Sequence, residues 1–158
     1  ARANALVGNP PGAGALELML LGGSFEVTGG SARFAVDGAP AALTIDGAPV
    51  APGSSVTARD GQTVTVGPAQ AGIFTYLATA GGLAVQPDLG SVSLQPRAGI
   101  GGVGGRALRP GDRLALGAQA EPSGPDLSLP ARPLDPDSPI RVVLGPQDDH
   151  FDPEAIEA

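Results

Sequence analysis

The chain contains no lysine and no cysteine, and these two absences exclude several classes of protein. All nine basic residues are arginine, so the chain holds no Walker-type phosphate loop, no lysine Schiff base and no lysine that could carry biotin. Without cysteine it forms no disulfide and offers no thiolate ligand or nucleophile. The lack of cysteine also agrees with a cytoplasmic location, which we expect for this protein.

Long apolar runs and clusters of positive charge are missing as well. No stretch reaches the ~20 apolar residues that a membrane helix needs. The formal net charge is −7 with a pI near 4.4, and the arginines form no run. We therefore expect neither a nucleic acid nor a membrane as a partner.

Glycine and proline are abundant, with 25 and 17 copies in 158 residues. Such a share occurs in disordered chains, but about a quarter of the residues here are Leu, Val, Ile or Phe. A charge of −7 is too weak to hold a chain of this length open. The composition therefore predicts a folded domain that is rich in turns.

From Ala15 onward the apolar residues follow a period of two or form short continuous runs, which predicts a mostly β fold. The predicted strands cover residues 16–21, 24–27, 32–36, 43–45, 63–66, 73–80, 113–116 and 140–144. Residues 73–80 include Tyr76 and form the most continuous apolar run, so we expect a central strand buried on both faces.

Aspartate–glycine pairs stand between several of these runs, at Asp37-Gly38, Asp46-Gly47 and Asp60-Gly61. Both residue types tolerate a left-handed backbone, so each pair suits a tight hairpin turn without further function. Short helices are expected at both ends: residues 1–7 resemble the last turns of one helix, and Asp152-Pro153-Glu154 begins another. We expect the natural polypeptide to continue beyond both.

Three regions follow from this pattern. Residues 1–117 hold most of the predicted strands. Residues 118–139 contain six prolines and predict an extended connector rather than packed structure. Residues 140–158 are predicted to hold a final strand and the start of a helix.

A glycine-rich segment at residues 99–104 matches the spacing of a dinucleotide-binding loop, but its context does not fit. A proline and a glycine soon after it, Pro110 and Gly111, leave no room for the long helix that such a site needs. Two interpretations remain open. The bare backbone, flanked by Arg97 and Arg106, could bind a carboxylate or phosphate, or the segment is a loop at the end of a barrel with solvated arginines.

The only histidine, His150, lies beside Asp148 and Asp149 in the segment 145–151. Consecutive ligands from one loop rarely converge on a metal and no second histidine exists, so we predict no metal site. General acid–base chemistry by His150 stays open beside a plain polar helix entry. No G-x-S-x-G elbow accompanies it, and a serine hydrolase is not predicted.

Four segments together resemble the biotin-dependent carboxyltransferase family, also called allophanate hydrolase subunit 2, which includes the C subunit of 5-oxoprolinase and the kinase-inhibitor antagonist KipA. No single motif is decisive, but the joint order is specific. In chain order the matching residues are Asn4 to Asn9 with Ala15-Leu16-Glu17; Tyr76-Leu77-Ala78 with Gly81-Gly82; Leu89-Gly90-Ser91 with residues 97–102, 105–108 and Gly111-Asp112; and residues 145–148 with Phe151.

The resemblance implies a protein of about twice this length, built from two cyclophilin-like β-barrel lobes. The resemblance implies that residues 1–117 are the first lobe, truncated at its start, and that residues 140–158 are a final strand and the entry to a second lobe that is mostly absent. This fragment alone is expected to be inactive. The family's usual opening stretch and its second lobe are absent from the 158 residues.

The resemblance also implies an enzyme in a heteromeric complex. Its partners are a B-type subunit that resembles KipI and, for 5-oxoprolinase, an A-type subunit, and ATP is used to open the lactam of 5-oxoproline. Relatives fused into urea carboxylase instead move a carboxyl group from biotin to urea, and biotin would then arrive on another chain or domain. A KipA-like regulator that binds a kinase inhibitor without catalysis is the alternative, and a plain scaffold is a third.

Five residues that match the family are expected to line the cleft. Arg97, Arg106 and Gln147 are the predicted catalytic residues, and Gly101 and Gly102 the predicted cofactor-binding residues. Arginines could neutralise a developing anion there, and glycine amides could donate to the same oxygens. Asn4, Asn9 and Glu17 also match, but capping and turn roles account for them.

Overall fold

The computed structural model describes residues 1–117, 124–130, 139, 141 and 143–157. Short strands dominate it, which confirms the mostly β prediction. In chain order the elements are α1 (Arg2–Leu6), β1 (Leu16–Met19), β2 (Gly23–Glu26), β3 (Ser31–Gly38), β4 (Leu43–Ile45), β5 (Ala48–Pro49), β6 (Val56–Arg59), β7 (Thr63–Val66), β8 (Phe74–Thr79), η1 (Asp148–His150) and α2 (Pro153–Glu157).

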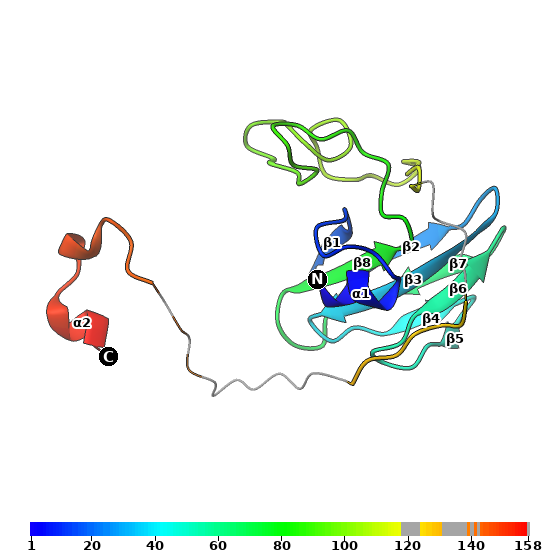
Figure 1. Cartoon of the computed structure of the whole chain (residues 1–158), viewed down its shortest axis with the longest axis horizontal. Coiled ribbons are helices and arrows are strands. Elements are labelled where there is room, and N and C mark those ends of the chain that lie inside the picture. Colours follow the sequence, from blue (N-terminus) through cyan, green and yellow to red (C-terminus); the bar gives the residue numbers. More distant parts are fainter. Residues whose placement is uncertain (118–123, 131–138, 140, 142, 158) are drawn as a thin grey trace.

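The strands form two antiparallel sheets of four strands each (Figure 1). Sheet A has the order β1-β8-β3-β6, and sheet B has the order β2-β7-β4-β5. The chain crosses from one sheet to the other at most of its connections. The crossing from β1 to β2 brings Gly22 against β7, where a Cβ atom would lie 1.7 Å from the carbonyl oxygen of Val66, so only glycine fits this corner.

The main core lies between the two sheets. Phe34 of β3 and Leu77 of β8 contribute from sheet A, and Leu43, Val64 and Val66 contribute from sheet B. All five are almost fully buried. The two-residue period of the sequence places these side chains on the inner faces, and their burial supplies most of the driving force for folding.

The outer face of sheet A carries a second, smaller core. Ala35 of β3 pairs with Ala78 of β8, and both side chains are fully buried beneath α1. Alanine leaves room for a helix to approach the sheet closely, so Leu6 of α1 is also buried there. None of the helices in the described ranges is long and apolar enough to cross a membrane.

Residues 124–130, here called the strap, cover the rest of this outer face beside β6. The amide of Ser55 donates to the carbonyl of Leu127 at 2.8 Å, and that of Leu129 donates to Gly53 at 2.8 Å. Ser54 and Ser128 form an isolated antiparallel bridge, and Leu129 packs against the core under α1. Residues 124–130 of the predicted connector are therefore packed against residues 53–55 and α1, while residues 118–123 and 131–138 lie outside the described part.

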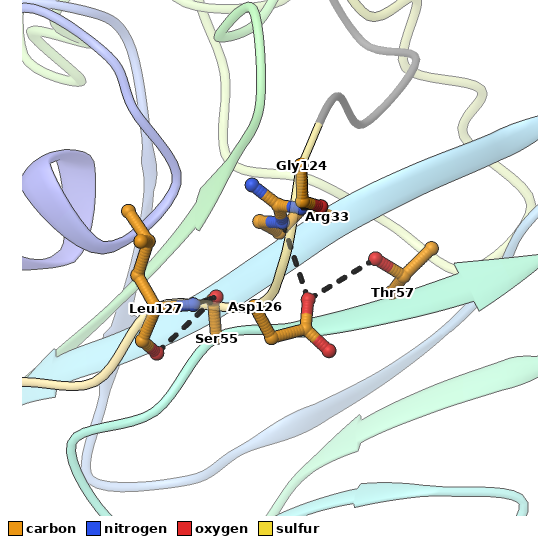
Figure 2. A network of polar contacts seen from close by, with 6 residues as sticks. All are labelled: Arg33, Ser55, Thr57, Gly124, Asp126 and Leu127. Carbon is orange, nitrogen blue, oxygen red and sulfur yellow. Dashed lines mark hydrogen bonds and ion pairs between the residues drawn. The ribbon is translucent and has the colours of Figure 1, made fainter.

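Polar contacts hold the strap in place (Figure 2). The Nε atom of Arg33 lies 3.2 Å from Oδ1 of Asp126, and its Nη2 atom donates to the carbonyl of Gly124. Thr57, which faces Arg33 across the β3–β6 ladder, donates to the same Asp126 oxygen at 3.2 Å. The strap thus lets Arg33 remain buried on an otherwise apolar face.

Most predicted strands are present, with corrections. β4 and β7 have the predicted limits, and β8 is central as predicted. The prediction that β8 is buried on both faces is wrong for its first half, where Phe74 and Tyr76 are exposed because α1 covers only Ala78 and Ala80. β5 and β6 were not predicted.

The aspartate–glycine pairs have three different roles. Asp46-Gly47 has positive φ at both residues and joins β4 to β5 as the predicted hairpin turn. Asp60-Gly61 turns between β6 and β7, which belong to different sheets. Asp37-Gly38 is no turn: it continues the β3–β8 ladder, where Asp37 pairs with Tyr76 and Gly38 with Thr75.

Two other predicted strands differ from the structure. Residues 113–116 are extended and share one bridge, Leu83 with Leu116, but form no longer ladder. In the segment 140–144 the described residues Arg141, Val143 and Leu144 are exposed and form no strand, and residues 140 and 142 lie outside the described part. Both expected helices are present, as α1 and α2.

Candidate functional site

The glycine-rich segment lies in a long excursion that leaves sheet A after β8. Residues 82–84 and 115–117 run antiparallel, with the Ala84 amide donating to Ala115 at 2.9 Å and the Gly117 amide to Gly82 at 2.9 Å. We call these two stretches, with their neighbours 85–86 and 113–114, the ribbon, and residues 87–112 the glycine loop. Figure 1 shows the loop, in green to yellow, standing away from both sheets.

Glycines of the loop stand where the backbone crosses itself. A Cβ atom on Gly101 would lie 2.0 Å from the carbonyl oxygen of Ser93, and one on Gly105 would lie 1.9 Å from that of Gly99. Gly101, Gly102 and Gly105 all have positive φ. Side chains at Gly101 and Gly105 would therefore clash as well as strain the backbone, which explains the glycine content without a ligand.

The amides of the predicted cofactor-binding residues are used inside the loop. Gly101 donates to Oδ2 of Asp88 at 2.7 Å, and Gly102 donates to the carbonyl of Val92 at 3.3 Å. The structure therefore assigns them to closing the loop, and these two N–H groups do not form an anion-binding concavity.

Arg106 is also engaged within the loop. Its Nη1 and Nη2 atoms lie 2.7 and 2.8 Å from the two carboxylate oxygens of Asp112, a bidentate pair. The Arg106 guanidinium, followed by the backbone amide of Arg109, holds the pKa of Asp112 well below its usual range, and Asp112 in turn raises the pKa of Arg106. The pair fixes the return path of the loop.

The structure does not bring the other predicted catalytic residues to this pair. Arg97 is exposed in the glycine loop, and its amide donates to Oε1 of Gln95 at 3.3 Å. Gln147 is exposed and precedes η1, in a C-terminal segment that Figure 1 shows apart from the sheets and the loop. His150 in the same segment is exposed, 4.0 Å from Asp149. Arg97 and Arg106 thus share one loop, and Gln147 lies elsewhere.

Asn4, Asn9 and Glu17 make structural contacts, but Glu17 lies on β1 and has neither a capping nor a turn role. The buried Asn4 side chain donates to the carbonyls of Pro11 and Ala13, and Asn9 binds the backbone of Thr79 and Gly81. These bonds tie the end of α1 to the start of the ribbon. Glu17 accepts a hydrogen bond from the hydroxyl of Tyr76 at 2.8 Å, which raises the pKa of Tyr76.

An open groove of about 270 Å³ lies where the glycine loop folds back over the ribbon. Its lining includes Gln86 and Arg113 from the two ribbon stretches and Gly102 and Val103 from the loop. Sequence reasoning missed Gln86 and Arg113. A signal was available in residues 113–116, where exposed Arg113 and Ala115 alternate with half-buried Leu114 and Leu116 and so mark a surface face.

Comparison with known proteins identifies relatives across the whole chain. The family described as carboxyltransferase domain, subdomain A and B, matches residues 1–158. The C subunit of the 5-oxoprolinase of Escherichia coli (strain K12) is 37% identical over 158 residues, covering 99% of this chain and 49% of that protein. A putative urea carboxylase of Emericella nidulans is 38% identical over 161 residues, covering 98% of this chain and 13% of that protein.

A solved structure agrees with these relatives. The crystal structure of TTHA0988 superimposes with a TM-score of 0.83 at 37% identity and covers 99% of this chain and 56% of that one. The chain thus spans about half the length of the bacterial relative and a small part of the fungal one.

Proposed function

Because the chain belongs to the family of carboxyltransferase domains, subdomain A and B, we propose that it acts as one lobe of a carboxyltransferase-type protein in a heteromeric complex. The complex would open 5-oxoproline at the expense of ATP, or transfer a carboxyl group to a small amide such as urea. The observation that carries this proposal is the 37% identity to the C subunit of a 5-oxoprolinase over 99% of the chain. The proposed partners are subunits of the B type and, for 5-oxoproline, of the A type.

The chain's own residues limit its part in the reaction. It contains no lysine, and the amides of Gly101 and Gly102 are already used, so the glycine loop does not fit a nucleotide. Biotin cannot be attached here for the same lack of lysine. We therefore place ATP binding and any biotin attachment on other chains or domains.

Arg97 is the loop arginine proposed to meet the reacting groups. It is exposed, and it has no ion-pair partner among the residues that the structure describes. A free guanidinium can stabilise negative charge that develops on a carboxyl or amide oxygen. Arg106 is proposed as a positioning residue through Asp112, and Gln147 as a contact from the C-terminal segment.

Reconstitution with the neighbouring subunits tests the proposal. We expect ATP-dependent 5-oxoproline hydrolysis or bicarbonate-dependent urea carboxylation only when this protein is present. Arg97→Ala should lower kcat at least about tenfold, while Arg59→Ala, an exposed arginine on β6, leaves it unchanged. Absence of turnover with every combination of subunits would contradict the enzyme function.

A regulatory role is the second candidate, and one observation favours it. The polar groups of the glycine loop bind mostly one another, as in the Arg106–Asp112 and Gly101–Asp88 contacts, so the loop holds few free groups for chemistry. A KipA-like protein would bind a KipI-like partner without turnover. Stable co-elution with a B-type partner, together with inactivity toward both substrates, would support this role instead.

A further inference from the structure

The groove between the ribbon and the glycine loop combines one free positive charge with an amide and apolar walls. Arg113 supplies the charge and Gln86 the carboxamide, and Val85, Val103 and Leu114 line the walls. A volume of about 270 Å³ suits a small molecule.

The Arg113 guanidinium is available to a ligand because its neighbours are engaged elsewhere. Adjacent Asp112 uses both carboxylate oxygens on Arg106 and also accepts from the amide of Arg109 at 2.8 Å. No ion pair joins Arg113 to any acid in the described ranges, whereas Arg2, Arg33 and Arg106 each have one. Asp112 is the acid nearest to Arg113 in the sequence. Because Asp112 is bound to Arg106, it does not pair with Arg113.

Gln86 faces the same groove from the opposite ribbon stretch. Its carboxamide is exposed and can both donate and accept a hydrogen bond, so it can bind an amide or lactam group. Val103 of the glycine loop also lines the groove and can contact a short hydrocarbon body.

The chemistry favours a carboxylate over a phosphate. One guanidinium forms a planar fork that matches a carboxylate, and the amides of Gly101 and Gly102, which could have cradled a phosphate, already donate to Asp88 and Val92. A neutral amide such as urea would leave the fork of Arg113 unused.

We propose that this groove binds a small carboxylic acid that also carries an amide or lactam, with Arg113 holding the carboxylate and Gln86 the amide. The assignment rests on the proposed function only in naming 5-oxoproline as the ligand of this class, and it favours 5-oxoproline over urea as the substrate.

Binding to the ¹⁵N-labelled 158-residue chain tests this site without requiring turnover. The probes are 5-oxoproline, acetate, urea and inorganic phosphate, each titrated separately. We expect 5-oxoproline to shift the amide signals of Gly102, Val103, Arg113 and Ala115, acetate to shift the same signals more weakly, and urea and phosphate to leave them unchanged. Arg113→Gln should weaken 5-oxoproline binding at least about tenfold.

Arg109→Gln is the matched control, since Arg109 is an exposed arginine four positions before Arg113, in the glycine loop, and does not line the groove. It should bind as the unaltered chain does. Because Arg113 is exposed, Arg113→Gln should keep the same melting temperature. Equal binding by Arg113→Gln, tighter binding of phosphate or urea, or no shift with any probe would overturn the assignment.

Measurement in the reconstituted complex separates this assignment from the proposed function. If turnover occurs, Arg113→Gln should raise KM for 5-oxoproline more than it lowers kcat, and an unchanged KM would count against the site. If 5-oxoproline binds through Arg113 but no complex turns over, the carboxylate site stands and the enzyme function fails.

Discussion

Two arginine–aspartate pairs in this molecule have the same chemistry and different effects on the structure. Arg33 and Asp126 are 93 positions apart and join sheet A to the strap; 7% of the Arg33 side chain and 46% of the Asp126 side chain are exposed. Arg106 and Asp112 are six positions apart and close the glycine loop, with 39% of the Arg106 side chain exposed. The second pair has the shorter and more numerous hydrogen bonds.

The better bonded pair should nevertheless matter less to the stability of the whole domain. Removing a carboxylate from a buried guanidinium costs more than removing one from an exposed guanidinium, which water can hydrate. The distant pair also holds one segment against another, while the local pair only shapes a loop. Burial and sequence separation, rather than bond length, therefore decide what an ion pair contributes here.

Breaking the Arg33–Asp126 pair, whose guanidinium is buried, should have the largest effect on stability. Asp126→Ala removes the carboxylate that both Arg33 and Thr57 bind, and we expect the free energy of unfolding to fall by about 2 kcal/mol. Urea denaturation measures the change. Asp149→Ala, at an exposed acid in the C-terminal segment, is the control and should change little. A loss for Asp126→Ala as small as that of the control would contradict the comparison.

Breaking the loop itself should have an intermediate and local effect. Gly101→Ala places a Cβ atom 2.0 Å from the Ser93 carbonyl, so the loop must open and its amides should exchange faster with solvent while those of sheets A and B stay protected. Hydrogen exchange followed by NMR distinguishes the two regions.

Gly99→Ala is a matched control for that loop variant. Gly99 has a similar positive φ of 65°, but nothing lies within 4 Å of its added Cβ atom. It should therefore show only the backbone strain of an alanine in this region, roughly 1–2 kcal/mol at most. Equal exchange in the two variants would mean that the close crossing at Ser93 is unimportant.

Lowering the pH should have the smallest effect on stability. Asp112 of the Arg106–Asp112 pair should lose its charge only at a lower pH than ordinary aspartates do. Because Arg106 depresses the folded-state pKa of Asp112, the stability that this carboxylate contributes is present above its unfolded pKa and is lost only as the pH falls through the lower folded value. Between pH 4 and pH 3, where ordinary aspartates take up protons, the Asp112 carboxyl carbon should keep the NMR shift of an ionised group. Arg106→Gln should return its titration toward the ordinary range, and protonation near pH 4 in the unaltered chain would contradict the geometry.

The same division between local and distant contacts explains what could be predicted from the sequence. The two-residue period predicts most strands because it reflects burial against one core, and Asp46-Gly47 predicts its hairpin because the turn depends on its own residues. β6 was not predicted because its sequence, Val56-Thr57-Ala58-Arg59, is short and half polar. The exposed half of β8 could not be predicted, since it depends on where α1 ends.

In the candidate site, too, local features could be predicted from the sequence and contacts between distant residues could not. The glycine loop could be located from composition, but the use of its amides depends on Asp88 and Val92, which the loop brings back to Gly101 and Gly102. Arg106 was predicted as a site residue for its charge. Only the folded loop shows that its guanidinium is already bound by the carboxylate of Asp112. The shared groove of Arg113 and Gln86, and the contact of Arg33 with Asp126 of the strap, both require the tertiary fold.

The strap also sets the order in which the polypeptide can assemble. Its docking edge includes Thr57 on β6 and Arg33 on β3, and that edge exists only once these two strands have paired. Residues 1–117 precede the strap and leave the ribosome before it, so the sheets can form first and residues 124–130 can attach afterward. We therefore expect the strap to dock late in folding, after the strands that carry Arg33 and Thr57 have paired.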